Sequence, residues 1–550
     1  MKTNGIVLSD KKFLIFIKSY KKYRTFPNLY KILIKLFKLV FFFECCMIFS
    51  GDFPVNDKKI GYAFLKTQLQ LPVFEPKVVA ELSTSVTSII RKDDLLLVPT
   101  RYRLAPDDLV GHILFALKHE GINLQILSEA LRHVSEESLL NSIASKLSGI
   151  YQRKLGYLWE FFNNKELPVT VPSNVRYIKL FDEDRYVTGH GIKNAKWQVI
   201  FNGLGNLNYC PTVEKTEKIK AALADDVLNR VRKYLSEIGR INADRALQWA
   251  YLSETESSYA IEGVRADLNK SERFVKLLEH AHDNVELTED YLCDLQNQVI
   301  SNPFDMAFSY RTEQNWLSGA GRGALAVTYV PPSPECLEDL MRAFLEMANS
   351  LPKQINPVIA ASIASFGFVF LHPFMDGNGR LSRFLFHQQL CLSGQLHKGQ
   401  LLPVSVAMRA SEEKYLAALQ DFSKPCRALW SVVWIADHDY DFRFKGSDAI
   451  YRYWDATSCA EFGLEMAEEA LDIHLRQEVN YLLSFDEIHR TVSERYDVRE
   501  TILHHLINGC LDLNGVVSKN LRKRYADRVE ESAFDFIEQV TRKVLTRHAS

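Results

Sequence analysis

The sequence lacks three features that would each point to a specific class of protein. It has no CxxC pair, no repeat of solenoid length, and no uninterrupted apolar run of the roughly 20 residues that a membrane-spanning helix needs. Its formal net charge is only −1 over 550 residues. A near-neutral chain has no protein-wide attraction for nucleic acid or an anionic membrane. The sequence therefore gives no strong nucleic-acid or membrane signal.

Cysteine is scattered along the chain and odd in number. The nine residues show no paired spacing, which indicates reduced thiols and a cytoplasmic protein. His504, His505 and Cys510 lie close together in the C-terminal part of the sequence. Their spacing matches no common zinc motif and favours an ordinary histidine pair.

Charge is unevenly distributed near the start of the chain. Residues 1–43 carry ten Lys/Arg against one acid, a net charge of +9, which leaves −10 on the other 507 residues. Three lysines and Glu44 interrupt the apolar stretch, so residues 1–46 predict neither a spanning helix nor a clean signal peptide. Two interpretations stay open: an upstream extension before a true start at Met47, or a basic arm or interfacial helix.

Hydrophobic periodicity predicts a mainly α protein with a small β element in its N-terminal half. Helical spacing runs through 107–162, and the pattern is helical again from 211 to the end. Short alternating runs predict strands or hairpin arms at 175–181, 184–189 and 195–201. We expect three regions after the leader: 47–210, mostly helical with a small β element; 211–445, helical; and 446–550, also helical.

The C-terminal region begins with a possible helix start. Ser484 and Glu487 have the spacing of a capping box, and two helices and a basic run come after them. A winged-helix-like arrangement stays open for this region. Acidic residues interleave with the helices, however, and favour a bundle that packs on its neighbour over one that reads DNA.

One segment interrupts the helical pattern of the second half. GAGRGALAVTYVPPSPE (319–335) combines a glycine-rich turn, the β-favouring VTYV and two prolines that stop any regular element. It predicts an exposed, extended flap, although taken alone it also fits an ordinary connector.

The most informative stretch is HPFMDGNGR (372–380). The preceding INPVIAASIASFGFVFL is apolar nearly all round, as a buried helix should be. Pro373 restricts the residue before it, so we expect the helix to end at His372 and His372 to be extended. A histidine held by a rigid element at the rim of a core is well placed to act as a general base.

A glycine-lined turn comes after the histidine. Gly377 and Gly379 permit close backbone approach, and an amphipathic helix begins at about Asn378. The N-terminus of a helix presents free N–H groups and a positive dipole end to an anion. Phosphate is the natural ligand for such a turn.

Three charged side chains complete the predicted phosphate site. Arg380 and Arg383 are three residues apart on the new helix, so both guanidinium groups can reach one polyphosphate. Asp376, just before the turn, can hold a divalent cation against phosphate oxygens.

These residues carry a resemblance to a known family. The run from His372 to Arg383 matches in full the HxFx(D/E)GNGRxxR signature of the Fic family, and the likeness extends over about 240–410. The family usually transfers AMP from ATP onto protein hydroxyl groups, on a helical core with a short β-hairpin flap. The resemblance implies a general base (His372), a Mg²⁺ ligand (Asp376), a backbone anion hole (Gly377, Asn378, Gly379), phosphate-binding arginines (Arg380, Arg383), an inward-pointing anchor (Phe374) and a target-positioning flap (Val327, Thr328, Tyr329).

A second motif lies upstream, in SETESSYAIEG (253–263). Ser258 and Glu262 are four residues apart on one helix face, and Gly263 marks the helix end. A glutamate in the last helical turn is disfavoured by the helix dipole, so Glu262 needs a partner. The segment resembles the (S/T)xxxE(G/N) inhibitory motif of Fic proteins, which implies that Glu262 pairs with Arg383 and blocks the γ-phosphate position.

The resemblance implies an auto-inhibited adenylyltransferase that uses ATP and Mg²⁺ and modifies Ser, Thr or Tyr on target proteins and on itself. Two alternatives stay open: an enzyme that removes AMP or transfers another phosphate-linked group, and a nucleotide-sensing regulator that binds a partner. The sequence also leaves open a homodimer.

Overall fold

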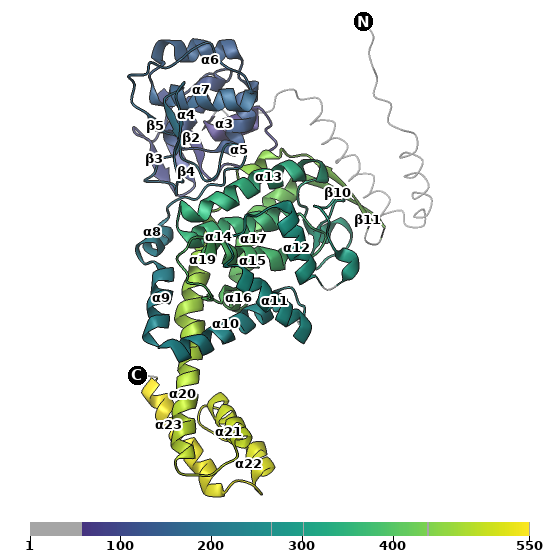
Figure 1. Cartoon of the computed structure of the whole chain (residues 1–550). Helices are drawn as coiled ribbons and strands as arrows, with labels where there is room; N and C mark the ends of the chain where they lie inside the picture. The colour runs from purple at the N-terminus through teal and green to yellow at the C-terminus, as the bar shows by residue number, and fades with distance from the viewer. Residues whose placement is uncertain (1–57, 266, 301, 437–438, 549–550) are drawn as a thin grey trace, which may run out of the picture. The chain divides into compact units, whose positions relative to one another are not determined.

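The computed structural model describes residues 58–265, 267–300, 302–436 and 439–548 (Figure 1). The expected leader at 1–46 and the expected start at Met47 lie outside these ranges. The chain divides into two compact units, Met1–Lys59 and Ile60–Ser550, and every predicted site residue belongs to the second. Within the described ranges, no helix combines the length and the apolar character that crossing a membrane requires.

The N-terminal part of the described chain mixes helices with two small sheets. Its helices are α3 (Tyr62–Gln68), α4 (Leu109–His119), α5 (Leu124–Ala130), α6 (Glu136–Ile143) and α7 (Ile150–Asn163). Its strands are β1 (Lys59–Ile60), β2 (Val79–Ser83), β3 (Ile90–Lys92), β4 (Leu95–Pro99), β5 (Ile178–Lys179), β6 (Ile192–Asn194) and β7 (Val199–Phe201). In the first sheet β2 runs parallel to β4 and β3 antiparallel to it; in the second, β5 runs parallel to β7 and β6 antiparallel to it.

The sequence predicted only part of this β structure. The runs 175–181 and 195–201 each contain a short strand, whereas 184–189 forms none beyond a single bridge at Tyr186. The sheet of β2, β3 and β4 was not predicted. These three strands are three to five residues long, and each of β2 and β4 alternates into the core at only two positions (Ala80 and Leu82, Leu96 and Val98), which is too short a pattern to recognise.

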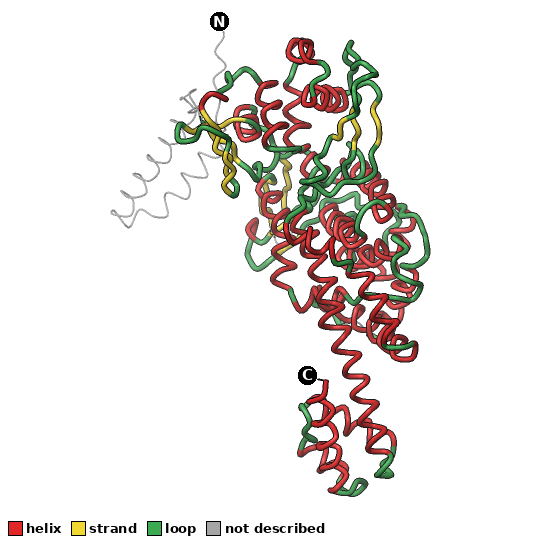
Figure 2. The backbone as a smooth tube through the Cα atoms, turned by 90° about the vertical axis from the view of Figure 1, so that its left-hand side faces the viewer, coloured by secondary structure: helices red, strands yellow, loops and turns green. Residues whose placement is uncertain are grey.

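Helices dominate the rest of the described chain (Figure 2). They are α8 (Glu217–Ala224), α9 (Val227–Glu237), α10 (Arg240–Ile261), α11 (Leu268–His280), α12 (Glu289–Val299), α13 (Pro334–Ser350), α14 (Pro357–Leu371), α15 (Asn378–Leu392), α16 (Val404–Ala410), α17 (Glu412–Ala428), α18 (Ala449–Arg452) and α19 (Thr457–Glu469). The prediction of a mainly α protein is confirmed.

Helix α14 is the centre of the hydrophobic core. Asn356 caps it by accepting hydrogen bonds from Val358 N and Ile359 N, and Pro357 occupies the first helical position. All of its residues except Val369 are buried, as the apolar sequence predicted. It packs against α15 and α19, so its C-terminal end gives rigid support to the turn that leads into α15 (Figure 1).

Two hairpins accompany the helices. The predicted flap contains β9 (Val327–Tyr329), which pairs antiparallel with β8 (Leu317–Ser318) just before the flap. A longer hairpin, β10 (Trp430–Ala436) and β11 (Asp439–Phe444), was not predicted in this largely helical part of the chain. Side chains on β11 alternate between exposed and half-buried, a period of two that the surrounding helical pattern obscured.

The C-terminal region forms a helical bundle with its own hydrophobic core. A π-helical segment, Ala470–Leu475, joins α19 to α20 (Arg476–Ser493), and α21 (Glu500–Asp512), α22 (Lys519–Tyr525) and α23 (Glu531–His548) complete the bundle. The expected capping box at Ser484 is wrong, because Ser484 is buried within α20 and starts no helix. The proposed regions 47–210, 211–445 and 446–550 stay predictions.

Candidate active site

The candidate site is the turn that joins α14 to α15. Helix α14 ends at Leu371 with His372 as its C-cap, as predicted. The expectation that His372 is extended is wrong: its backbone is left-handed, with φ 50° and ψ 58°. The ring of Pro373 excludes the right-handed helical conformation, and a left-handed residue satisfies that restriction while turning the chain sharply.

The imidazole of His372 is oriented by its own helix. Nδ1–H donates to the Val369 carbonyl oxygen at 3.1 Å, so Nε2 is left with a free lone pair. Burial lowers the pKa of His372 to about 4, and the nearby Arg311 guanidinium adds to the effect. The ring is therefore neutral near pH 7, and Nε2 is able to accept a proton.

The turn after the histidine is braced by one asparagine. Asn378 Oδ1 accepts from Phe374 N at 3.0 Å, and Asn378 Nδ2 donates to the Phe374 carbonyl at 2.7 Å. Phe374 is buried and points inward, where it anchors the turn. Gly377 has φ 86°, a backbone angle that glycine adopts without strain. These contacts hold the turn in the conformation seen here.

Both predicted arginines are buried on α15 and fixed by hydrogen bonds. Arg383 Nε donates to Ser258 Oγ and Arg383 Nη2 to the Ser258 carbonyl, each at 2.7 Å. Arg380 Nη1 donates to the Val299 carbonyl at 2.5 Å. The structure therefore brings Ser258, predicted from a motif far upstream, directly onto the second arginine.

Glu262 joins the two arginines. Its Oε1 accepts from Arg383 Nη2 at 2.8 Å, and its Oε2 lies 2.8 Å from Arg380 Nε. Burial alone would lower the pKa of Arg380, but the carboxylates of Glu262 and Asp376 outweigh it and raise that pKa. The sequence indicated only Arg383 as a partner, so the contact with Arg380 is new.

The Glu262 carboxylate also lies over the N-terminus of α15. A Cβ atom added at Gly379 would meet Glu262 Oε1 at only 2.4 Å. The first N–H groups of a helix have no partner inside it and attract anions. A carboxylate in contact with Gly379 therefore occupies the position that the turn offers to a phosphate group.

Asp376 lies beside the same turn. Its Oδ1 accepts from Gly377 N at 2.7 Å and from Arg380 Nη2 at 3.0 Å, and its side chain is 43% exposed. A half-exposed carboxylate beside an anion site is the type of oxygen donor that Mg²⁺ takes together with phosphate oxygens. The residue thus fits the predicted cation, although in this conformation its carboxylate is paired with Arg380.

The flap is attached to the helix end that carries His372. Tyr329 is buried, and its hydroxyl donates to the Phe370 carbonyl in the last turn of α14. Val327 is also buried, whereas Thr328 between them is exposed. The flap therefore has a fixed position relative to His372, with one strand face open to solvent.

Two supporting residues were not recognised in the sequence. Buried Arg311 donates from Nε to the His372 carbonyl at 2.9 Å and from Nη2 to the Pro332 carbonyl at 2.5 Å, which connects the turn after α14 to the flap. Burial lowers the pKa of Arg311 to about 10. Asn315 Nδ2 donates to the Phe374 carbonyl at 2.9 Å. Both lie far upstream of the signature, and no local pattern marks them.

Comparison with known proteins shows which family the site region resembles. Residues 286–390 match the Fic/DOC family, and this range includes the turn and both arginines. The chain therefore contains a region that is similar to the Fic domain. Glu262 and Ser258 lie upstream of the matched range.

Individual relatives carry the name protein adenylyltransferase Fic. The one from Nematostella vectensis is 25% identical over 209 residues, covering 33% of this chain and 47% of the relative. The one from Drosophila willistoni is 42% identical over 113 residues, covering 20% of this chain and 21% of the relative. The chain thus spans half or less of the length of the curated relatives it matches. A Fic family protein structure from Desulfovibrio desulfuricans G20 aligns over 59% of this chain and 89% of its own, at 19% identity and a TM-score of 0.36.

Proposed function

We propose that this protein transfers AMP from ATP to a hydroxyl group of a target protein, and that Glu262 restrains the reaction. The proposal rests mainly on one observation: the free Nε2 of His372 belongs to the same turn as the N-terminus of α15, a helix that carries two buried arginines. A neutral base and a polyphosphate site on one turn are the groups that nucleotidyl transfer requires.

The proposed chemistry assigns one task to each residue. The target hydroxyl oxygen bonds to the α-phosphorus, the bond to the β-phosphate oxygen breaks, and pyrophosphate leaves. His372 Nε2 takes the hydroxyl proton as this occurs. The backbone N–H groups at Gly377, Asn378 and Gly379 hold phosphate oxygens, and Arg380 and Arg383 stabilise the β- and γ-phosphates. Asp376 would hold Mg²⁺, which neutralises phosphate charge when bound.

We propose the flap as the docking element for the target. An extended target segment can lie along Val327, Thr328 and Tyr329, because backbone pairing positions a hydroxyl without demanding a particular sequence. Arg311 supports both the flap and His372, so the two parts of the site stay in register.

The contacts of Glu262 support the restraint. Its carboxylate pairs with both arginines and lies over Gly379. A γ-phosphate that binds there has to displace it. ATP that binds without those contacts has its α-phosphate misaligned for in-line attack. The protein should therefore bind nucleotide and transfer it slowly.

Two labelled substrates test the proposal. The full chain is incubated with Mg²⁺ and either α-labelled or γ-labelled ATP, with and without a lysate of protein targets. Label should enter protein only from the α position, because pyrophosphate carries the γ-phosphate away. Transfer of γ-label would make the protein a phosphotransferase of another type.

A second candidate function is hydrolytic removal of AMP. Glu262 supports it, because a carboxylate fixed by two arginines could orient a water molecule. AMP-modified target should then lose label in the wild type and keep it in Glu262→Gly. A pure nucleotide sensor, the third alternative, should show neither reaction, and the intact His372 argues against it.

A further inference from the structure

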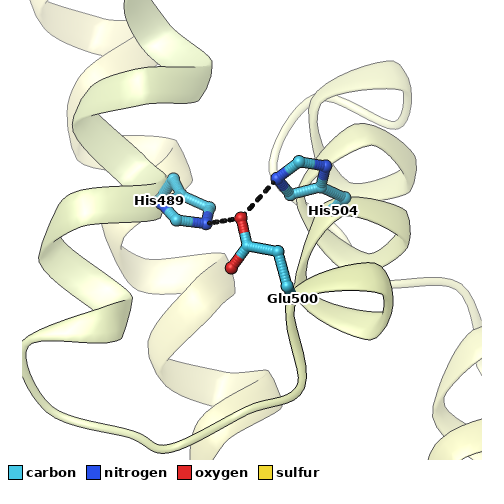
Figure 3. Close-up of side chains that lie close together, drawn as sticks. All are labelled: His489, Glu500 and His504. Atoms are coloured by element: carbon cyan, nitrogen blue, oxygen red, sulfur yellow. Dashed lines mark hydrogen bonds and ion pairs between the residues drawn. The ribbon is translucent and has the colours of Figure 1, made fainter.

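The C-terminal bundle gathers three ligand-type side chains on its surface. His489 lies on α20, and Glu500 and His504 lie on α21 (Figure 3). Glu500 Oε1 accepts a hydrogen bond from His489 Nε2 at 2.9 Å and lies 2.8 Å from His504 Nε2. One donor atom from each of the three residues lies within 4.8 Å of the other two.

The local sequence explains why these side chains converge. Glu500 and His504 are four residues apart, so they share one face of α21. Phe485, one turn before His489 on α20, stacks on the His489 ring at 6.0 Å and meets the His504 ring edge-on at 5.1 Å. These aromatic contacts hold both imidazole rings in place. Figure 3 shows the two rings turned toward the Glu500 carboxylate.

The structure also separates residues that are adjacent in the sequence. His504 faces His489 and Glu500, whereas His505 donates or accepts through Nδ1 with the Tyr525 hydroxyl at 2.8 Å. Cys510 is buried in the core of the bundle. The grouping of His504, His505 and Cys510 considered from the sequence therefore does not form, and a different set of three does.

The donor set has a definite chemical preference. Two imidazole nitrogens and one carboxylate oxygen suit Zn²⁺ and similar borderline cations, whereas Mg²⁺ and Ca²⁺ prefer oxygen ligands alone. Zinc bonds to these donors are about 2.0–2.2 Å long and tetrahedral, which places the donor atoms roughly 3.3–3.5 Å apart. The carboxylate oxygen at 2.8–2.9 Å from the two nitrogens needs to withdraw by only about half an ångström.

The cluster is reachable from solvent. The side chains of His489, His504 and Glu500 are 25%, 47% and 64% exposed. An ion can therefore enter without unfolding the bundle, and one coordination position stays open for water. On binding, each ring gives up the Nε2 proton that faces Glu500, takes the tautomer with its proton at Nδ1, and offers the Nε2 lone pair to the cation.

We propose that His489, Glu500 and His504 form a binding site for Zn²⁺ or a similar divalent transition-metal ion. The ion connects α20 to the start of α21 across the intervening loop. A cation that binds only the folded arrangement stabilises the bundle by mass action.

Metal stoichiometry tests the site on the full chain. Wild type and variants are stripped with a chelator, dialysed against Zn²⁺ and analysed for bound zinc. Wild type should retain one equivalent more than His489→Ala, His504→Ala or Glu500→Gln, while the matched control His505→Ala should retain as much as wild type. The comparison between variants removes any contribution from other histidines and cysteines.

A spectroscopic measurement keeps the test independent of folding defects. Co²⁺ added to wild type should give visible absorption bands of a tetrahedral site, and His489→Gln, which can still hydrogen-bond Glu500, should lose them with its helical circular dichroism unchanged. Equal zinc content and equal Co²⁺ spectra in wild type and ligand variants would overturn the proposal and leave a hydrogen-bonded cluster only. Loss of the extra equivalent in His505→Ala would also overturn it, because the ligand set would then be different.

Discussion

Glu254 on α10 lies 2.6 Å from His387 on α15, and both side chains are buried. The same carboxylate accepts from Ser405 N at 2.8 Å and from the Ser405 hydroxyl. Glu254 is two helical turns before Glu262, so this buried contact fixes the helix that carries Ser258 and Glu262 against the helix that carries the arginines.

Glu254→Ala should therefore destabilise the protein strongly. The change leaves His387 Nε2 and Ser405 N buried without a partner, and each buried polar group left without a hydrogen bond typically costs roughly 1–3 kcal/mol. The denaturant midpoint measures the effect. Glu256→Ala on the same helix is the control, because Glu256 is exposed and should change stability little. Equal midpoints for the two variants would show that the buried contact contributes nothing.

Glu262→Gly should raise AMP transfer. Removing a charge-assisted contact with Arg383 worth roughly 1.5–3 kcal/mol shifts the balance toward the open site by about 10- to 100-fold. Glu262→Gln should give a smaller gain, since it loses charge and keeps bulk. Arg383→Ala in the Glu262→Gly background should cancel the gain. A time course of α-label incorporation separates the variants, and no gain in Glu262→Gly would refute the restraint.

His372→Ala, made in the active Glu262→Gly background, should lower transfer by about 10²–10⁴-fold. Nucleotide affinity should change by no more than a few-fold, since the histidine contributes no phosphate contact. Burial holds the pKa of His372 near 4. In the variant that keeps His372, the rate of AMP transfer should therefore not fall through histidine protonation between pH 8 and pH 6. Initial rates across that range, with calorimetric nucleotide binding, check all three statements.

Arg427→Ala should weaken target recognition. Arg427 Nε donates to the Val327 carbonyl at 2.9 Å and Arg427 Nη2 to the Ala324 carbonyl at 3.1 Å, so it supports the flap from α17. The KM for target should rise several-fold with nucleotide binding unchanged, because only the docking strand is loosened. Lys424→Ala, an exposed change on the same helix, is the control.

Glu120→Gln should change how stability depends on pH. Burial raises the pKa of Glu120 to about 8, against the opposing hydrogen bond from Tyr62 N. Between pH 4.5 and pH 8 the folded carboxyl keeps a proton that the unfolded chain has lost, so wild-type stability falls as pH rises. The variant cannot titrate. At pH 8 the free energy of unfolding of Glu120→Gln should exceed that of wild type by more than about 1.4 kcal/mol, the energy of one pKa unit. At pH 4.5 the two values should differ little. Urea unfolding at the two pH values tests this.

The sequence predicted those parts of the site that are local in the chain. His372 to Arg383 is contiguous, so a buried helix, a glycine turn and a new helix could be recognised together, and Ser258 and Glu262 share one helix face. The sequence did not predict Arg311 or Glu254, because their partners His372 and His387 are 61 and 133 residues away. No local periodicity records such a contact.

The missed strands have a related cause. The hairpin of β10 and β11 has an alternating hydrophobic pattern. Its neighbours α17 and α18 are helical, so a search for helical periodicity over a window of residues merges the short hairpin with them. The strands β2 and β4 pair parallel although β3 lies between them in the sequence, so no hairpin turn joins the two and marks them as a pair. The left-handed backbone of His372 was missed for another reason: Pro373 excludes one conformation and does not select between the remaining two.

The position of Glu262 one residue beyond the end of α10 determines how fast the blocked protein can respond. Glu254 and the hydrogen bonds between Ser258 and Arg383 fix helix α10. Glu262 lies just beyond the end of α10, so it can move away when only the last turn of that helix loosens. Loosening one helical turn takes nanoseconds to microseconds, far less than the time of one turnover in a typical enzyme. If Glu262 restrains the reaction as proposed, blocked and open forms should exchange rapidly, and basal activity should equal the open fraction multiplied by the open rate. A partner that raises activity would then have no helix to pull away and would only have to capture the open conformation.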